Sequence, residues 1–520
     1  MSKYLMAIDA GTGSIRSVLF DLEGHQIGAA QHEWDHKEDP RYPGSMDFDW
    51  EHNWELTKQC IREVLAKTAV DSADIAAIST TCMREGILLY DKDGNELWAC
   101  ANVDARANEE VISLLQSRPE LEARLYATTG QSFALDAIPR LLWVKKHLPE
   151  IYAKTAAMGM FNDWLIYKLS GVLVIEPSNG STTGFMDLKT RNWDRSIPEQ
   201  LGLRTDIFPR VGEPGEIVGA TTDALLSETG LKPGIPVVIG GGDAQLGCIG
   251  VGVVNPNDAA IFGGSFWQYE YNTRVPKTDS TCRVRVNCHA IADVWQYEAL
   301  AFKPGLVMRW FRDAFCQQEK LLAKEQGRDV YDLMNEKASD VPAGCYGMMC
   351  TFSDVMNFIS WKHASPTFTN FDLDPARFNK YTFYRAILEN TALVSKGHVD
   401  LVYESTGHRP DQIIFASGAS KSSLWSQILA DVLGIRILVP VVKESTALGA
   451  AILAGHGVGI YTDISETSKR LVQIERVHEP NAENHALYMG LYETWRKLYQ
   501  KQLDISDSGI TKHMWKAPGI

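Results

Sequence analysis

One apolar segment that runs into a glycine-rich turn constrains the fold of this chain most. Residues 6–21, MAIDAGTGSIRSVLFD, predict a strand that ends at Asp9, a turn and a second strand. Backbone N–H groups of a glycine-rich turn can approach an anion, and an acid at the strand end can hold hydrated Mg²⁺. The turn lacks the Lys of a Walker A loop and fits the Rossmann fingerprint poorly, so an ordinary hairpin is the alternative. The candidate phosphate-binding residues are Thr12, Gly13, Ser14 and Arg16.

The length of 520 residues exceeds what one hydrophobic core supports, so we expect two large domains. An apolar fraction of 45% and a charged fraction of 22% are typical of globular proteins. The 51 basic and 65 acidic residues give a net charge of −14, which disfavours nucleic acid or an anionic membrane as a partner because both need a positive surface. A small-molecule substrate is favoured instead.

Nine cysteines are scattered along the chain without a CxxC pair or zinc-finger spacing, which predicts reduced, mostly buried thiols. The apolar stretch before Asp9 is too short for the h-region of a signal peptide, and no segment reaches the roughly 18 apolar residues of a membrane span. We therefore expect a cytoplasmic protein.

Two opposite charges, Arg84 and Glu85, follow an apolar strand predicted over 75–79. An adjacent Arg and Glu are typical of an ion pair that faces water, but ligands of open α/β sheets gather at the carboxyl ends of strands. Asp104 poses a similar choice between a helix N-terminal acid and a ligand. The stretch SNGSTT (178–183) is predicted to be a hydroxyl-rich connector.

A second acid, Asp243, follows an apolar strand and three glycines in PVVIGGGDAQLGC (236–248), with Gln245 two residues on. The glycines leave Asp243 little steric cover, so a ligand can approach its carboxylate. Soon after, AAIFGGSFW (259–267) repeats the opening order of strand, small residues and hydroxyl. Two halves that each begin with such a hairpin predict an internal repeat, with domains 1–250 and 251–520 around a cleft that holds the ligand.

The second half also predicts helices over 381–401, 424–433 and 483–502, and a strand from 412 that enters the small-residue turn SGASKSS (417–423). A Gly/Ala-rich helix is predicted over 446–454. Its small residues permit close approach to a neighbouring element, which is the packing role expected of Gly449.

The order of these features resembles the FGGY carbohydrate kinases nearly from end to end. Four strings carry the resemblance: DAGTGSIRSVLFD (9–21), GGGDAQLGC (240–248), FASGASKSSLWSQILADVLG (415–434) and STALGAAILAG (445–455). The resemblance implies an α/β fold of two actin/hexokinase-like (RNase H-like) ATPase domains that flank a catalytic cleft. It places the substrate mainly on the first domain and ATP mainly on the second, in a monomer or dimer.

The matching motif positions also imply a role for each candidate residue. Asp243 corresponds to the catalytic base, and Asp9 and Asp243 to a Mg²⁺ site that acts partly through water. The implied substrate-binding residues are Arg84, Glu85, Asp104, Asp243 and Gln245. The implied ATP-binding residues are Thr12, Gly13, Ser14, Arg16, Gly264, Ser265, Gly418 and Ser422.

Shorter strings are similar to the branch of the family that acts on the quorum-sensing signal autoinducer-2: CMREG (82–86), ANVDARA (101–107), FNDWL (161–165), WFRDAFC (310–316) and WKAPG (515–519). Those kinases phosphorylate linear 4,5-dihydroxypentane-2,3-dione on its terminal (C5) hydroxyl. The resemblance further implies a regulatory contact with the phosphocarrier protein HPr, for which the chain shows no motif. Two alternatives stay open: a pentulose or polyol kinase of the same family, and an actin-like ATPase or nucleotide-gated sugar sensor, which would not need Asp243 or the Arg84–Glu85 pair.

Overall fold

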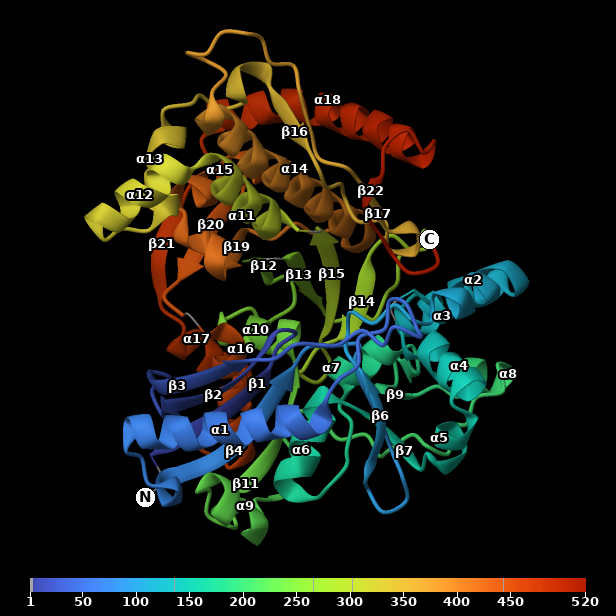
Figure 1. The fold of residues 1–520 in the computed structure, drawn as a ribbon. Helices are drawn as coiled ribbons and strands as arrows, with labels where there is room; N and C mark the ends of the chain where they lie inside the picture. The colour runs from blue at the N-terminus through green and yellow to red at the C-terminus, as the bar shows by residue number, and fades with distance from the viewer. Residues whose placement is uncertain (1–2, 135, 265, 302, 443) are drawn as a thin grey trace.

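Two mixed β-sheets, one in each half of the chain, form the framework of the molecule (Figure 1). The structure is a computed structural model that describes residues 3–134, 136–264, 266–301, 303–442 and 444–520. The first sheet has the strand order β10–β11–β4–β1–β2–β3 and the second β14–β15–β13–β12–β19–β20–β21. The first contains β1 (Tyr4–Ala10), β2 (Ser14–Asp21), β3 (Gln26–Glu33), β4 (Ile75–Cys82), β10 (Ile217–Ala220) and β11 (Pro236–Gly242). The second contains β12 (Ala259–Gly263), β13 (Trp267–Thr273), β14 (Arg285–Cys288), β15 (Trp295–Ala301), β19 (Gln412–Ala416), β20 (Arg436–Pro440) and β21 (Ile474–His478).

The two sheets repeat one strand arrangement. Each starts with an antiparallel meander, β1–β2–β3 in the first and β12–β13–β15 in the second. A parallel strand then joins the first strand of the meander, β4 or β19, and a second parallel strand follows, β11 or β20. An antiparallel edge strand closes both sheets. This order carries the internal repeat that the two glycine hairpins predict.

The first sheet is buried on both faces, which explains why β1 is almost continuously apolar. Alternate residues of β1 point to opposite faces, so Met6 and Ile8 pack with α1 (Trp50–Thr68) and α6 (Phe161–Ser170). Leu5 and Ala7 face the other way and pack with α16 (Ser445–Gly457). α1 begins directly after Asp49, whose side chain accepts a hydrogen bond from the N–H of His52.

Helix α16 belongs to the second half in sequence but packs on the first sheet (Figure 1). It also crosses α10 (Asp243–Gly250) at close range, because a Cβ added at Gly449 would lie 2.0 Å from the Leu246 carbonyl oxygen. The predicted packing role of Gly449 is therefore confirmed, and its neighbour is the helix that begins at Asp243.

The remaining elements cover these two sheets or form small sheets beside them. The larger helices are α2 (Asn108–Ser117), α3 (Pro119–Thr129), α4 (Ala137–His147), α9 (Asp223–Thr229), α11 (Pro304–Phe315), α12 (Gln317–Gln326), α13 (Val330–Ser339), α14 (Lys380–Thr406), α15 (Ser423–Leu433), α17 (Ile464–Leu471) and α18 (Ala482–Asp507). The shorter helices are α5 (Pro149–Lys154), α7 (Pro177–Gly180) and α8 (Ser196–Gln200). The small sheets consist of β5 (Ile87–Tyr90), β6 (Glu96–Cys100) and β7 (Ala157–Met160), of β8 (Met186–Asp187) and β9 (Asn192–Trp193), of β16 (Met349–Thr351) and β18 (Thr367–Thr369), and of β17 (Lys362–Ala364) and β22 (His513–Lys516).

All nine cysteines are buried and unpaired, as the sequence predicts. Within the described ranges, each helix is too short or too polar to span a lipid bilayer.

Candidate active site

A cavity of about 680 Å³ lies between the two halves of the chain and is lined by residues of both. Five of the residues predicted from sequence line it together: Thr12, Arg84, Glu85, Asp104 and Asp243. The second half contributes further lining residues, among them Gln268, Arg285, Leu300, Trp361 and Trp515. The cavity therefore combines charged residues of the first half, Arg84, Glu85, Asp104 and Asp243, with a mixed polar and apolar surface of the second half.

The glycine run of β11 delivers Asp243 to this cavity. A Cβ at Gly240 would lie 1.6 Å from the Thr80 carbonyl oxygen, so only glycine permits the approach of β11 to β4. The Gly242 N–H donates to Ser178 Oγ at 2.9 Å. The stretch 178–183 is consequently not the surface connector that the sequence predicts, because all six residues are buried and one of them fixes the strand end before Asp243.

The Asp243 carboxylate starts α10 and is the most accessible acid of the charged group, with 41% of its side chain exposed. Desolvation by the surrounding protein raises the pKa of Asp243, while the Arg84 guanidinium opposes that shift. Arg84 Nε donates to Asp243 Oδ1 at 3.1 Å. The carboxylate therefore keeps a free edge toward the cavity and a fixed edge toward Arg84.

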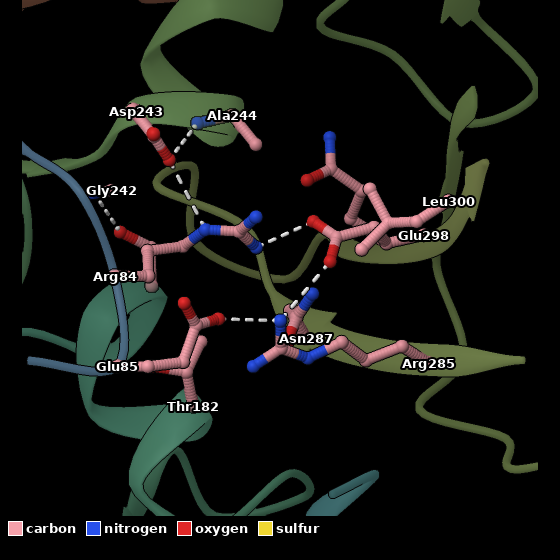
Figure 2. Close-up of polar contacts among 12 residues, drawn as sticks. Arg84, Glu85, Thr182, Gly242, Asp243, Ala244, Arg285, Asn287, Glu298 and Leu300 are labelled. Atoms are coloured by element: carbon pink, nitrogen blue, oxygen red, sulfur yellow. Dashed lines mark hydrogen bonds and ion pairs between the residues drawn. The ribbon is translucent and has the colours of Figure 1, made fainter. Parts of the chain in front are cut away.

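Arg84 does not form a water-facing ion pair with Glu85, which is the alternative that the sequence leaves open. It is 5% exposed and lies between Asp243 and Glu298 of β15, with 2.5 Å from Arg84 Nη1 to Glu298 Oε2 (Figure 2). Arg285 Nη1 approaches the same Glu298 carboxylate at 3.1 Å and Glu85 Oε1 at 2.6 Å. Five side chains thus alternate in charge, in the order Asp243, Arg84, Glu298, Arg285 and Glu85, and link the two halves across the cavity.

Glu85 has a left-handed backbone with φ of 67°, which is uncommon for a residue other than glycine. Arg140 donates to its carbonyl oxygen and, through Nη2, to the carbonyl of Asn102 at 2.9 Å. This conformation turns the Glu85 carboxylate toward Arg285 and away from its sequence neighbour Arg84.

Sequence reasoning missed Arg285 and Glu298, although both carry a recognisable signal. Arg285 is the first residue of β14 and Glu298 lies within β15, both strands are buried throughout, and charged residues are seldom fully buried unless paired. Glu270 of β13 lies opposite Glu298 in the register and is also fully buried. Burial and the Glu298 carboxylate raise the pKa of Glu270 well above its usual range, while the two arginines hold the pKa of Glu298 below its usual value despite its burial.

The two other predicted substrate-binding residues, Asp104 and Gln245, lie in different places. Asp104 lines the cavity, but its carboxylate accepts from the Met46 N–H at 2.6 Å and pairs with Arg106 at 2.7 Å. Gln245 is fully buried and lies outside the set of described residues that line the cavity. The helical register explains this position, because α10 turns the side chain of its third residue back toward Gly242.

The first glycine hairpin has open space beside its backbone. A Cβ added at Gly13 would meet no atom within 4 Å, whereas the Thr12 carbonyl accepts from Trp34 Nε1 at 3.1 Å and lies 2.7 Å from His36 Nε2. Thr12 Oγ1 accepts from Asn102 Nδ2 at 3.0 Å, and Ser14 starts β2. The turn is thus fixed from one side and leaves room for an anion at Gly13.

Arg16 and Asp9 lie side by side behind this turn. Arg16 Nη1 is 3.1 Å from Glu444 Oε2, at the start of α16, and 3.9 Å from Asp9 Oδ2. Burial raises the pKa of Asp9 to about 7, against the pull of Arg16 and with a further contribution from Asp243. The carboxylates of Asp9 and Asp243 are only partly neutralised by the nearby arginines, and carboxylate oxygens are ligands that suit Mg²⁺. No cluster of three or more His, Cys, Asp or Glu in the described part of the chain could hold a metal, so an ion at Asp9 and Asp243 needs water or phosphate as further ligands.

A second cavity, of about 540 Å³, brings together the predicted ATP-binding residues of the second half. Gly264, Gly418 and Ser422 line it, with Tyr331 and Asn335 of α13. A Cβ at Gly418 would meet no atom within 4 Å, and Ser422 caps α15 by accepting from the Trp425 N–H at 3.1 Å. The turn at Gly264 is one residue tighter than the first hairpin, since the Gly264 N–H donates to the Phe266 carbonyl at 2.8 Å whereas the Gly11 N–H donates to the Ser14 carbonyl at 2.9 Å. Ser265 lies outside the described residues.

Comparison with known proteins gives full-length similarities. Curated autoinducer-2 kinases of Salmonella paratyphi B (strain ATCC BAA-1250 / SPB7) and Yersinia enterocolitica (serotype O:8 / biotype 1B) are 49% and 50% identical over 518 residues, 99% of this chain and 98% of each relative. Among solved structures, a xylulose kinase from Rhodospirillum rubrum has a TM-score of 0.83 at 23% identity and covers 97% of this chain and 99% of its own. A Plasmodium falciparum glycerol kinase with ADP has a TM-score of 0.82 at 18% identity and covers 95% and 98%.

The two halves also match a family separately. Residues 4–250 match the N-terminal domain of the FGGY family of carbohydrate kinases, and residues 272–458 match its C-terminal domain. The two mixed α/β sheets agree with the fold of such two-domain sugar kinases. On both grounds the chain belongs to the FGGY family of carbohydrate kinases.

Proposed function

We propose that this chain is an ATP-dependent kinase that phosphorylates the C5 hydroxyl of autoinducer-2, 4,5-dihydroxypentane-2,3-dione. The observation that carries the proposal is its 49–50% identity to autoinducer-2 kinases along 99% of the chain. A cavity in which an accessible acid lies beside a paired arginine and glutamate supports it. A short polyhydroxylated substrate suits this size and polarity.

Asp243 acts in this proposal as the general base. Phosphoryl transfer depends mainly on positioning and on neutralisation of charge, so the protein has to orient one hydroxyl and accept its proton. The exposed edge of the Asp243 carboxylate accepts the C5 proton, while Arg84 holds the other edge. Arg84 and Glu85 can donate to and accept from the vicinal oxygens at C4 and C5, so replacing either should raise KM for the substrate more than KM for ATP.

The nucleotide, in the same proposal, spans the two hairpins. The second cavity holds the adenosine, the Gly13 amide faces the phosphates, and Gly264 lies beside them in the second hairpin. Mg²⁺, when bound by Asp9 and Asp243 partly through water, supplies the neutralisation of phosphate charge. We place the division between substrate and nucleotide domains at residues 250 and 251, and a regulatory contact with HPr remains part of the proposal.

Product identification tests this function. The enzyme is incubated with ATP, Mg²⁺ and, separately, dihydroxypentanedione, xylulose, ribulose and glycerol, and the phosphorylated product is identified by mass spectrometry and NMR. We expect phosphate on C5 of the dione, with ADP release that depends on this substrate. Faster turnover of a pentulose would assign a different carbohydrate kinase activity, and ADP release without any acceptor would favour an ATPase or sensor.

A further inference from the structure

The segment of residues 515–520 forms part of the substrate cavity, although the proposed reaction does not use it. Trp515, Ala517, Pro518 and Ile520 all line the cavity that holds Asp243. These residues follow β22 at the far end of the sequence from the Asp9 hairpin, and Figure 1 shows this red segment descending between the halves toward α2.

The segment is held firmly on the side of the second half. β22 pairs antiparallel with β17, and beyond the strand the Ala517 N–H donates to the Trp361 carbonyl at 2.9 Å. The rings of Trp361 and Trp515 meet edge to face, with centroids 4.8 Å apart. Ala517 is only 3% exposed. The backbone of the segment is therefore fixed relative to the second sheet.

The same segment also contacts the first half. The Gly519 N–H donates to Asn108 Oδ1 at 2.6 Å, at the start of α2. Gly519 has φ of 80°, and a Cβ there would lie 2.3 Å from Val111 Cγ1, so only glycine fits against α2. The segment thus crosses from one half to the other over the cavity and closes one side of it.

The chemistry of this side differs from that of the charged group. Its side chains other than Lys516 are apolar, as are Trp361 and Leu300 beside it in the cavity lining. Lys516 also lines the cavity and is the single charged side chain of the segment, but it is exposed, so its ammonium group is hydrated. Dihydroxypentanedione has a matching asymmetry, because C1 is a methyl group while C4 and C5 carry hydroxyls. A pentulose carries a hydroxymethyl group at C1 instead.

We propose that residues 515–520 form an apolar wall that receives the C1 methyl group of the substrate and selects against a C1 hydroxyl. The inference rests on the proposed function, since it assumes that the C5 hydroxyl lies at Asp243. A hydroxyl buried against the side chains of Pro518 and Ile520 would lose its hydrogen bonds to water without gaining a partner from them. An apolar surface of this kind rejects an added hydroxyl by up to about 100-fold.

The test compares two substrates that differ only at C1, dihydroxypentanedione and 1,4,5-trihydroxypentane-2,3-dione. The wild type should have a kcat/KM for dihydroxypentanedione about tenfold or more above its kcat/KM for the trihydroxy compound. Ile520→Asn, which offers a partner to a C1 hydroxyl, should reduce that preference by about fivefold or more and leave KM for ATP unchanged. Ile510→Asn is the matched control, because Ile510 is 78% exposed and lies outside the cavity. Thermal unfolding of each variant establishes that it folds. Ile520→Ser, whose hydroxyl also offers a partner, replaces Ile520→Asn if the latter does not fold, with the same expected direction.

The outcomes separate the two proposals. A wild type that phosphorylates the dione but shows no preference at C1, or a preference that Ile520→Asn leaves unchanged, overturns the wall and leaves the proposed function standing. A wild type that makes no phosphorylated product from the dione overturns the proposed function, and the wall with it, before any variant is needed.

Discussion

Asp243 is the residue on which the proposed chemistry depends most directly. Asp243→Ala removes the carboxylate that accepts the C5 proton but leaves both glycine hairpins and the second cavity intact. A general base typically contributes about 10²- to 10⁴-fold, so kcat should fall by about that factor or more while ATP binding remains measurable by calorimetry. Near-normal turnover would remove Asp243 from the mechanism.

Glu298 is the residue that lets two buried arginines lie close together. Glu298→Gln keeps the shape of the side chain but removes the anion between Arg84 and Arg285. Loss of one member of a buried ionic group costs about 3–5 kcal/mol, so we expect a comparable fall in the free energy of unfolding. KM for the dione should also rise more than KM for ATP, because Arg84 and Glu85 lose their fixed positions.

Glu270 provides the matched control for this variant. It faces Glu298 across the strand pair, and burial together with the Glu298 carboxylate raises its pKa and favours its protonated form, which Gln matches in shape and charge. We expect unfolding energies and KM values near wild type. Equal losses of unfolding free energy in Glu270→Gln and Glu298→Gln would show that the packing of the β13–β15 pair, rather than the anion shared by Arg84 and Arg285, determines the stability.

Glu122 gives a pH dependence whose sign can be worked out. Burial raises its pKa from 4.5 to about 7, with one opposing hydrogen bond from the Phe133 N–H. The folded state therefore binds a proton more tightly than the unfolded state, and its stability falls as pH rises from about 4.5 through 7. Glu122→Gln removes this loss, so its unfolding free energy relative to wild type should increase by about 3 kcal/mol between pH 4.5 and pH 8. Urea titrations at both pH values measure it, and an equal difference at the two would contradict the shifted pKa.

Three of the residues predicted from sequence, Arg84, Glu85 and Asp243, follow the end of an apolar strand. They could be singled out because strand ends collect ligands in open sheets. Arg285 and Glu298 lie within strands of the second half, and their partners are distant in sequence. The residues next to Arg285 and Glu298 in the sequence therefore cannot indicate these partners. Gln245 shows the converse, since proximity to Asp243 along the chain did not bring its side chain into the cavity.

For the secondary-structure elements, the sequence predicts where helices form but not which elements they pack against. The long helix predicted over 381–401 extends in the structure from Lys380 to Thr406, where Gly407 ends it in a left-handed conformation. The Gly/Ala-rich composition of α16 predicted close packing, yet nothing local indicated that this helix packs on the first sheet. Tertiary packing decides that choice, because α16 is apolar on all sides and could be buried in either half.

The crossing of α10 and α16 gives a prediction at this scale. Gly449→Ala would place a methyl group 2.0 Å from the Leu246 carbonyl, so the helices must separate and α10 must shift with Asp243 at its first turn. We expect lower thermal stability and a reduced kcat. Gly490→Ala is the control, because Gly490 lies exposed on α18 with nothing within 4 Å of an added Cβ. There, alanine should stabilise the helix by up to about 1 kcal/mol. Similar effects of the two changes would contradict the close crossing.

At the scale of the whole molecule, the position of α16 means that the first half lacks part of its own covering. One face of the first sheet, with Leu5, Ala7 and Val18, is covered by residues 447–454 from the other half. A fragment of residues 1–250 would expose this apolar face to water, and exposed patches of that kind lead to association. We therefore expect the fragment to aggregate, or to bind a hydrophobic dye and unfold at a lower temperature than the full chain.

A fusion that appends residues 444–458 to this fragment through a flexible linker isolates the cause. The appended helix should reoccupy the face between Leu5 and Val238 and restore a monodisperse protein with a cooperative thermal transition. A fusion that carries charged residues in place of Leu448 and Ile452, both buried in this packing, should fail to do so. A stable, monomeric fragment 1–250 without the helix would mean that the first half folds independently. In that case α16 would connect the two halves rather than complete the core of the first half.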